Sequence, residues 1–257
     1  MSRSRTGRPS VSRPCVSRAN TSRAKQGRSN MAGSSPRMAI NGARGRMGRE
    51  ILALIEADSR QGTCALAIDQ STPPGEISSM AADLVIDFSS PQGLTRICQI
   101  LAKHPLPLLS GTTGLDASHE RLLRALSRKA PVLWTSNTSL GIAALKKALR
   151  SLKMLGEFDF HVEEIHHKKK VDAPSGTART LQQELTSLKL KNLSSPVSLR
   201  AGGVPGLHRV WAIGENEWLC FEHMAFNRKL FAQGALQLAL LLYRRPPGFY
   251  SVEDLLG

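Results

Sequence analysis

Short apolar runs alternate with amphipathic segments in the first half of the chain. Five runs are short and rich in aliphatic residues, as buried strands are, and they lie at residues 38–40, 64–68, 83–88, 106–109 and 132–134. Three segments between them repeat apolar residues at helical spacing, at residues 49–55, 91–103 and 116–128. Strands that alternate with helices predict an α/β fold with a Rossmann-type, doubly wound parallel sheet.

The pattern changes in the second half of the chain. Residues 158–163 alternate between apolar and polar positions, which indicates a strand with one buried face, and Ser175 is placed to cap a following helix. Further strands are expected at residues 197–200, 207–213 and 218–223. A last apolar helix at residues 230–243 would return to the first sheet. We therefore expect a second, α+β domain with a mixed sheet at residues 137–231, inserted between the two parts of the first domain, 38–136 and 232–257.

A glycine-rich turn joins the first expected strand to the first expected helix. Its glycines follow the spacing GxxGxxG at Gly42, Gly45 and Gly48. Gly42 would permit a tight turn, Gly45 would let the backbone approach a pyrophosphate, and Gly48 would let the helix pack on the strand. A plain turn can have the same composition, but this position between strand and helix indicates a dinucleotide-binding domain, with the pyrophosphate at the helix N-terminus.

The second expected strand ends at an acid, Asp69, which comes 21 residues after Gly48. An acid at about 20 residues from the glycine turn binds the ribose hydroxyls of NAD in Rossmann domains. The next residue is Gln70 rather than a base, which favours NADH, whereas Arg44 or Arg46 could reach the 2′-phosphate of NADPH. We therefore expect NADH or NADPH as the cofactor.

Small polar residues follow three further strands, in the loops at residues 89–91, 111–114 and 135–139. Ligands of parallel sheets bind beyond the carboxyl ends of the strands, so these loops could bond to a nicotinamide and its ribose. Each loop could also be a helix cap, because Ser, Thr and Asn are common caps. Their matching positions at one edge of the sheet favour binding.

The densest group of charged residues is EEIHHKKKVDAPSGTA at residues 163–178. It places two histidines and three lysines at the end of a strand and before a helix. Histidine can act as a general acid near neutral pH, and lysine can bind carboxylates. N–H groups at the helix N-terminus add a further anion site. The group predicts a catalytic site for an anionic substrate, although a solvated basic turn beside a helix cap has the same charges.

Most of the net positive charge of the chain lies outside the predicted folded domains. The 257 residues carry a formal net charge of +15, which is typical of nucleic-acid-binding proteins. Nine basic residues lie in residues 1–37, which contain no acid, so the remaining 26 basic residues exceed the 20 acids by only six. The folded domain is therefore not expected to bind nucleic acid.

Residues 1–37 consist mostly of small and basic residues with few large apolar ones, so we expect a disordered basic tail. Three explanations stay open for it: translation upstream of a true start at Met31 or Met38, an organellar transit peptide, or a segment that binds nucleic acid. We expect a cytoplasmic protein, or an organellar one if the tail is a transit peptide.

Cysteine spacing and hydropathy exclude two further classes. The four cysteines, Cys15, Cys64, Cys98 and Cys220, show no metal-binding spacing, so we expect reduced thiols and no metal site. No apolar run approaches the roughly 20 residues of a membrane-spanning helix. Neither a metal nor a membrane is therefore expected as a partner.

Six motifs follow one another in the chain: NGARGRMGRE, VIDFSSPQG, SGTTGL, SNTSLG, HHKKKVDAPSGTA and FEHMAFNRKLFAQGAL. In this order, from about Met38 onward, they resemble the dihydrodipicolinate reductase (4-hydroxy-tetrahydrodipicolinate reductase) family of lysine and diaminopimelate biosynthesis. The resemblance implies that a reduced nicotinamide nucleotide reduces a cyclic, unsaturated imine dicarboxylate to tetrahydrodipicolinate. It also implies a homotetramer, formed through the mixed sheet of the substrate-binding and oligomerisation domain.

The resemblance further implies roles for individual residues. His166 matches the proton donor and Lys170 its partner at the substrate, while His167, Gly176 and Thr177 match contacts with the substrate carboxylates. The residues that match nucleotide contacts are Gly42, Ala43, Arg44, Gly45, Arg46, Met47, Asp69, Gly111, Thr112, Thr113, Thr135, Ser136, Asn137 and Thr138.

The sequence departs from the family at two positions near the nucleotide. Arg44 replaces a commonly small residue, and Gln70 replaces a base that often follows the ribose acid, which argues against a strict NADPH preference. The main alternative is another two-domain Rossmann dehydrogenase, but a semialdehyde dehydrogenase would need a nucleophilic cysteine, and none lies in the strand-end loops. A tail-dependent nucleic-acid-binding protein is a third hypothesis. An inactive regulatory Rossmann protein is a fourth, against which His166 and Lys170 argue.

Overall fold

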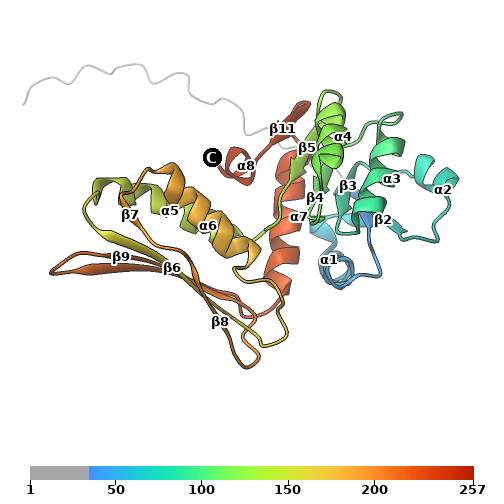
Figure 1. Ribbon diagram of the computed structural model, residues 1–257. Helices are drawn as coiled ribbons and strands as arrows, with labels where there is room; N and C mark the ends of the chain where they lie inside the picture. Colours follow the sequence, from blue (N-terminus) through green and yellow to red (C-terminus); the bar gives the residue numbers. More distant parts are fainter. Residues whose placement is uncertain (1–34) are drawn as a thin grey trace, which may run out of the picture. The chain divides into compact units, whose positions relative to one another are not determined.

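The computed structural model describes residues 35–257 and contains two β-sheets, each packed against helices (Figure 1). The expected tail at residues 1–37 lies outside the described residues except for its last three, and Arg37 is already the first residue of a strand. Across the described part of the chain, every helix is too short or too polar to cross a membrane.

The first sheet has six parallel strands. In chain order they are β1 (Arg37–Asn41), β2 (Thr63–Ile68), β3 (Leu84–Asp87), β4 (Leu108–Ser110), β5 (Pro131–Trp134) and β11 (Gly248–Tyr250). Their order across the sheet is β11-β5-β4-β3-β1-β2, so the winding reverses between β1 and β3. Ligands of open parallel sheets bind beyond the strand ends at such a reversal. The glycine turn follows β1 and therefore lies at the expected position for a dinucleotide.

Helices cover both faces of this sheet. One face packs against α1 (Arg46–Ala57), which a short 3₁₀ helix η1 (Ser59–Gln61) follows, and against α7 (Lys229–Tyr243) and α8 (Val252–Leu256). The other face packs against α2 (Pro74–Ser78), α3 (Pro91–Leu101) and α4 (Ala117–Ser127). Successive side chains of a strand point to opposite faces, so Met38 and Ile40 of β1 enter the first of these clusters and Ala39 enters the second.

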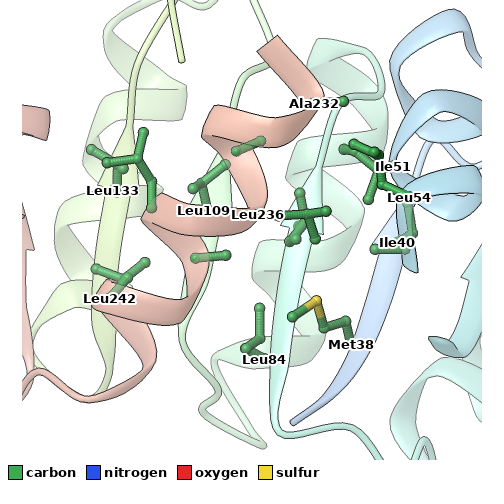
Figure 2. Close-up of a cluster of buried hydrophobic side chains, with 14 of the residues drawn as sticks. Met38, Ile40, Ile51, Leu54, Leu84, Leu109, Leu133, Ala232, Leu236 and Leu242 are labelled. Carbon is green, nitrogen blue, oxygen red and sulfur yellow. The ribbon is translucent and has the colours of Figure 1, made fainter. Parts of the chain in front are cut away.

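The last long helix, α7, completes the core of the first sheet. Figure 2 shows Leu236 and Leu242 of α7 among side chains of the strands, including Leu109 of β4 and Leu133 of β5. All four residues are buried. This confirms the expectation that the helix near residues 230–243 returns to the first sheet.

The second sheet is mixed. Its strands are β6 (Asp159–His166), β7 (Asn192–Leu193), β8 (Val197–Arg200), β9 (Leu207–Ile213) and β10 (Trp218–Met224). β6 pairs in parallel with β7 and β8 and antiparallel with β9, which pairs with β10. One face packs against α5 (Leu140–Leu149), which continues into η2 (Arg150–Met154), and against α6 (Gly176–Ser187) (Figure 1). The predicted fold class, a Rossmann-type sheet plus an α+β part with a mixed sheet, is confirmed.

The structure differs from the predicted elements in the elements that it adds and in several bounds, such as those of β3, β6 and α3. It adds the helices α2, α5 and α8 and the short strands β7 and β11, which the pattern did not predict. It also begins β4 at Leu108 instead of residue 106. Pro107 has no N–H group to donate to a sheet, so regular pairing on both sides of the strand begins after it.

Candidate active site

The glycine turn joins β1 to α1 where the winding of the sheet reverses. Gly42 has a φ of +83°, and a Cβ atom there would lie 2.4 Å from the carbonyl oxygen of Phe88. A Cβ atom at Gly48 would lie 2.3 Å from the carbonyl oxygen of Gly42. Both positions therefore require glycine, one for the tight turn and the other for close packing of the helix on the strand.

The N-terminus of α1 is available to an anion. Its N-cap is Gly45, and no described side chain caps the helix, whereas α3, α4, α5 and α6 each have a side-chain cap. The free N–H groups of the first turn and the helix dipole favour negative charge at this position. The geometry fits the pyrophosphate of a dinucleotide.

A cavity of about 670 Å³ opens beside the glycine turn. Gly42, Arg44, Gly45 and Asp69 line it, as expected for nucleotide contacts. Further lining residues, to which the sequence analysis gave no role, are Asn41, Ser71, Phe88, Gln92, Gly93 and Arg96. The side chains of Ala43 and Met47 instead pack in or against the hydrophobic core, so only their backbone groups could contact a nucleotide.

Asp69 follows β2 and holds its carboxylate in a fixed place. Oδ1 accepts hydrogen bonds from the N–H group and the hydroxyl of Ser71, at 2.8 and 2.7 Å. Oδ2 lies 2.6 Å from Nε of Arg44 in an ion pair. The hydrogen bonds from Ser71 are the main cause that lowers the pKa of Asp69. A charged carboxylate thus stands where the ribose of a dinucleotide is expected.

A buried carboxylate that the sequence analysis missed, Asp87, organises the loops at the strand ends. It accepts hydrogen bonds from Nδ2 of Asn41 at 2.7 Å and from the hydroxyls of Ser89, Ser110 and Thr112 at 2.5, 2.7 and 2.7 Å. The donors come from the ends of β1 and β4 and from the loops after β3 and β4. Asp87 therefore fixes the loops that border the nucleotide cavity.

The other predicted nucleotide contacts occupy these loops in different ways. The hydroxyls of Thr112 and Thr138 are buried and donate to Asp87 and to the carbonyl oxygen of Phe231, at 2.7 Å in each case, so only backbone groups of these two threonines could reach a nucleotide. The remaining members are exposed or half-buried: Arg46, Gly111, Thr113, Thr135, Ser136 and Asn137.

The predicted catalytic group spans the end of β6 and the start of α6. His166 is the last residue of β6 and is buried, and the hydroxyl of Ser175 caps α6 by accepting the N–H group of Ala178 at 3.1 Å. A Cβ atom at Gly206 would lie 3.0 Å from Nε2 of His166, so the loop between β8 and β9 passes close to the imidazole.

Glu164 lies at the centre of this group and was not assigned a role from the sequence. Its side chain is 0% exposed, and Oε1 accepts hydrogen bonds from the N–H group of Ser175 at 2.9 Å, the hydroxyl of Ser198 at 2.7 Å and Nη2 of Arg200 at 2.8 Å. Oε2 lies 3.2 Å from Nδ1 of His166. Burial alone would raise the pKa of Glu164, but the hydrogen bonds outweigh it and hold the pKa at about 2. Glu164 is therefore ionised at neutral pH.

The imidazole of His166 experiences opposing influences. Burial lowers its pKa most, the carboxylate of Glu164 raises it, and the charges of Lys170 and Arg200 lower it further. The Nδ1 atom lies close to Glu164 but is not aligned with it as in a hydrogen bond. The net result is a pKa below the usual value for histidine, although the ring lies next to a carboxylate.

The structure brings the loop after β5 next to the N-terminus of α6. Nδ2 of Asn137, after β5, donates to Oγ1 of Thr177, in the first turn of α6, at 2.9 Å. Lys170 pairs with Asp172 at 2.7 Å, and its N–H group donates to the carbonyl oxygen of His167 at 3.0 Å. Thr177, one of the predicted substrate contacts, therefore borders the loop after β5.

Three side chains in this group could be metal ligands by distance. Donor atoms of Glu164, His166 and His208 all lie within 4.8 Å of one another. However, Arg200 already pairs with Glu164, and positive charge that lowers the pKa of His166 would also repel a metal cation. We therefore interpret the group as a hydrogen-bonding and charge network around His166.

We expect the free energy of unfolding to fall between pH 7 and pH 4 partly because of His208. Burial, together with the nearby His166, lowers the pKa of His208 from 6.5 to about 4. Between these values the unfolded chain binds a proton that the folded chain does not. This contribution is therefore fully present above pH 6.5 and is lost as the pH falls towards 4, by up to about 3 kcal/mol.

Urea unfolding at several pH values would test this for the unmodified protein and for His208→Gln, which should have a flatter pH dependence. Replacement of the exposed His104 by glutamine is the matched control and should keep the original slope. Equal slopes in all three proteins would contradict the expectation.

Comparisons with known proteins agree with this arrangement. The family profile described as dihydrodipicolinate reductase, N-terminus, matches residues 36–138, and the profile described as dihydrodipicolinate reductase, C-terminus, matches residues 140–256. The 4-hydroxy-tetrahydrodipicolinate reductase of Bdellovibrio bacteriovorus is 41% identical over 222 residues, which cover 86% of this chain and 96% of that protein. The protein of the same name from Wolinella succinogenes is 35% identical over 253 residues, with 86% and 99% covered.

A solved structure has a similar fold. A dipicolinate-bound dihydrodipicolinate reductase from Paenisporosarcina sp. TG-14 superposes with a TM-score of 0.71 at 18% sequence identity. The superposition covers 84% of this chain and 97% of that one.

Proposed function

The chain belongs to the dihydrodipicolinate reductase family, and from this premise we propose which of its residues carry out the reaction. It reduces 4-hydroxy-tetrahydrodipicolinate to tetrahydrodipicolinate with NAD(P)H in lysine and diaminopimelate biosynthesis. The family assignment sets aside the alternative of a semialdehyde dehydrogenase. When bound, the reduced nicotinamide supplies a hydride.

His166 is proposed as the proton donor. Addition of a hydride to an unsaturated imine leaves an electron pair on the substrate, and a positioned acid lowers the barrier by protonating it. The observation that carries this assignment is the buried imidazole beside the ionised Glu164, at the end of β6. Nδ1 faces the carboxylate, so the proton delivered to the substrate would be the one on Nε2 of the doubly protonated imidazole, which is left neutral with its remaining proton on Nδ1.

The two carboxylates of the substrate require positive charge and N–H donors. Lys170 and His167 supply cationic or polar groups in the turn after β6, and the first turn of α6 supplies the N–H groups of Gly176 and Thr177. The contact between Thr177 and Asn137 supports a substrate position next to the loop after β5, which is expected to contact the nicotinamide. Lys170 would exchange its partner Asp172 for a substrate carboxylate.

The nucleotide is proposed to lie along the cavity beside the glycine turn, with its pyrophosphate at the N-terminus of α1 and its adenosine ribose at Asp69. The absence of a side-chain cap on α1 among the described residues supports the first placement. The ionised carboxylate of Asp69 supports the second, because it can accept hydrogen bonds from ribose hydroxyls. We propose that both NADH and NADPH are used.

An assay coupled to dihydrodipicolinate synthase tests the proposed function. The purified chain should oxidise NADH or NADPH only when the synthase supplies its product. Loss of nicotinamide absorbance without the synthase product, or no loss with it, would contradict the assignment. Omission of the synthase and omission of this chain are the two controls.

We also propose a homotetramer, because the second sheet has an apolar face that no helix of residues 35–257 covers. Pairing of β6 with β8 and β9, and of β9 with β10, puts the following residues on this face: Ile165, Val197, Leu199, Trp211, Ile213 and Trp218. Trp218 is 61% exposed and packs against Trp211 in a tilted arrangement, with ring centroids 5.0 Å apart. A row of ion-paired residues, Glu163, Arg209 and Glu222, crosses the same face between these apolar side chains. Exposed apolar groups on a sheet face favour burial against a second copy of the chain, and the charged row could pair with its counterpart there.

Replacing Trp218 by glutamate should convert the tetramer into smaller species, because a charge would be buried in the interface. Sedimentation velocity or light scattering coupled to gel filtration would measure the mass. Met154 is also large, apolar and 81% exposed but lies in η2, outside the sheet, so Met154→Glu is the matched control and should leave the mass unchanged. A monomeric unmodified protein would contradict the proposal.

We also propose that the chain forms two domains and is cytoplasmic. The division into residues 38–136 with 232–257 and residues 137–231 is supported by the membership of the strands in two sheets. A cytoplasmic location is supported by the bacterial origin of the relatives described above.

A further inference from the structure

One corner of the nucleotide cavity contains two arginines beside a single ionised carboxylate. Arg44, from the glycine turn, pairs with Asp69, which follows β2. Arg96, from α3, donates through Nη1 to the carbonyl oxygen of Asp69 at 3.2 Å and through Nη2 to that of Thr72. The residue after Asp69 is the uncharged Gln70. The positive charge of this corner therefore comes from the glycine turn and from α3.

The two oxygens of Asp69 are not equally available. Oδ1 already accepts two hydrogen bonds from Ser71 and a longer one from the hydroxyl of Thr72 at 3.4 Å. Oδ2 has Arg44 as its partner among the described residues. A ribose hydroxyl that binds this carboxylate must therefore share or displace the guanidinium of Arg44. The 2′-hydroxyl of NADH and the side chain of Arg44 compete for one oxygen.

Arg44 can pair with a phosphate without leaving Asp69. Its side chain is 83% exposed, and the ion pair is made through Nε, so the Nη edge of the guanidinium is the one left for a second anion. A guanidinium is planar and has five N–H donors. It can therefore bind two anions at once, each at a different edge of its plane. A 2′-phosphate could then bind to the Nη edge while Nε stays on Oδ2. The guanidinium would separate the phosphate from the carboxylate, which would otherwise repel each other.

We propose that Arg44 determines the choice between the two nucleotides, admitting NADPH by bridging Asp69 and the 2′-phosphate and weakening NADH by occupying Oδ2. The inference rests on the proposed nucleotide position and deepens it. It assigns to the glycine turn the role that a base directly after the ribose acid would otherwise have. Arg96, tied to two carbonyl oxygens, adds positive charge to the corner but is not free to move onto the phosphate.

Binding of adenosine fragments tests this without catalysis. Calorimetry would compare adenosine 2′,5′-bisphosphate with adenosine 5′-monophosphate on the unmodified protein, Arg44→Ala and Arg44→Lys. Loss of a charge-assisted contact should weaken the bisphosphate about tenfold or more in Arg44→Ala and leave the monophosphate equal or tighter. Arg44→Lys should keep part of the preference, because the charge remains but the planar set of N–H donors is lost.

Steady-state kinetics give a second readout. In Arg44→Ala the ratio of kcat/KM for NADPH to kcat/KM for NADH should fall about tenfold or more. Arg60→Ala is the matched control, since Arg60 forms a similar exposed ion pair with Asp58 at 2.7 Å outside the cavity, and it should leave the ratio unchanged.

Two results would overturn the inference. An unchanged preference between the two fragments in Arg44→Ala would do so, as would equal weakening of both, which would mean that Arg44 contacts a part that both fragments share, such as the adenine or the 5′-phosphate. Failure of the proposed function has a different signature. In that case the unmodified protein would bind the bisphosphate in an Arg44-dependent manner but would not reduce the synthase product with either nucleotide.

Discussion

Replacing His166 by alanine should lower kcat by a factor of about 10² to 10⁴ with either nucleotide, which is the usual contribution of a positioned general acid. Hydride addition without a proton donor leaves the electron pair on the substrate to be protonated by water. The KM for the nucleotide should change little, because His166 does not line the cavity beside the glycine turn. kcat and kcat/KM for the dicarboxylate should therefore fall together.

Steady-state rates and nucleotide binding measured on the same preparation would separate the two effects. His104→Ala, at an exposed histidine, is the control and should retain the original kcat. If His166→Ala retained the original turnover, the proton would have to come from another group and the assignment would be wrong. Weakened nucleotide binding together with lost turnover would instead indicate that the variant disturbs the fold.

Replacing Glu164 by glutamine should have the second large effect, on both stability and the pH profile. Oε1 is the partner of Arg200, whose side chain is only 17% exposed. Removal of one member of a buried ion pair leaves the other charge uncompensated and commonly costs about 3–5 kcal/mol of folding free energy. The Glu164 carboxylate also raises the pKa of His166, so its loss should lower that pKa further.

If His166 must be protonated to act, the alkaline limb of kcat against pH should move to lower pH in Glu164→Gln. A purely structural role for Glu164 would lower the amount of active protein without moving this limb. The double variant Glu164→Leu with Arg200→Met is the matched control, because replacing both partners with apolar groups often restores stability. It should recover stability but not the original pH profile; an unmoved alkaline limb in Glu164→Gln would refute the positioning role.

Elements with a strong local signal could be predicted from the sequence. The alternation of apolar and polar residues predicted the strand at β6, and the predicted bounds of β8 and β9 agree with the structure. Elements that depend on tertiary contacts were missed. β11 has three residues and exists only because it pairs with β5, and α2 and α8 have five residues each, too few for a periodic pattern.

The same distinction applies to the site. His166 and Lys170 stand in one compact run of charged residues, so their chemistry is visible in the sequence. Arg200 and His208 come to Glu164 from β8 and β9, and the donors to Asp87 come from separate loops. Contacts between residues so far apart in the sequence leave no local pattern, because they follow from the pairing of strands across the sheet. For Glu164 and Asp87, the available signal in the sequence was an acidic residue inside a predicted strand.

The late position of α7 and β11 has a consequence for synthesis on the ribosome. Leu236 and Leu242 cover the apolar face of strands that were made more than a hundred residues earlier, such as β1 and β3. Until these last segments leave the exit tunnel, α1 covers only part of that face, and the nascent chain exposes the remaining apolar surface. A premature stop near residue 225 would therefore produce an aggregation-prone fragment, even though every residue of the glycine turn and of the His166 cluster would be present.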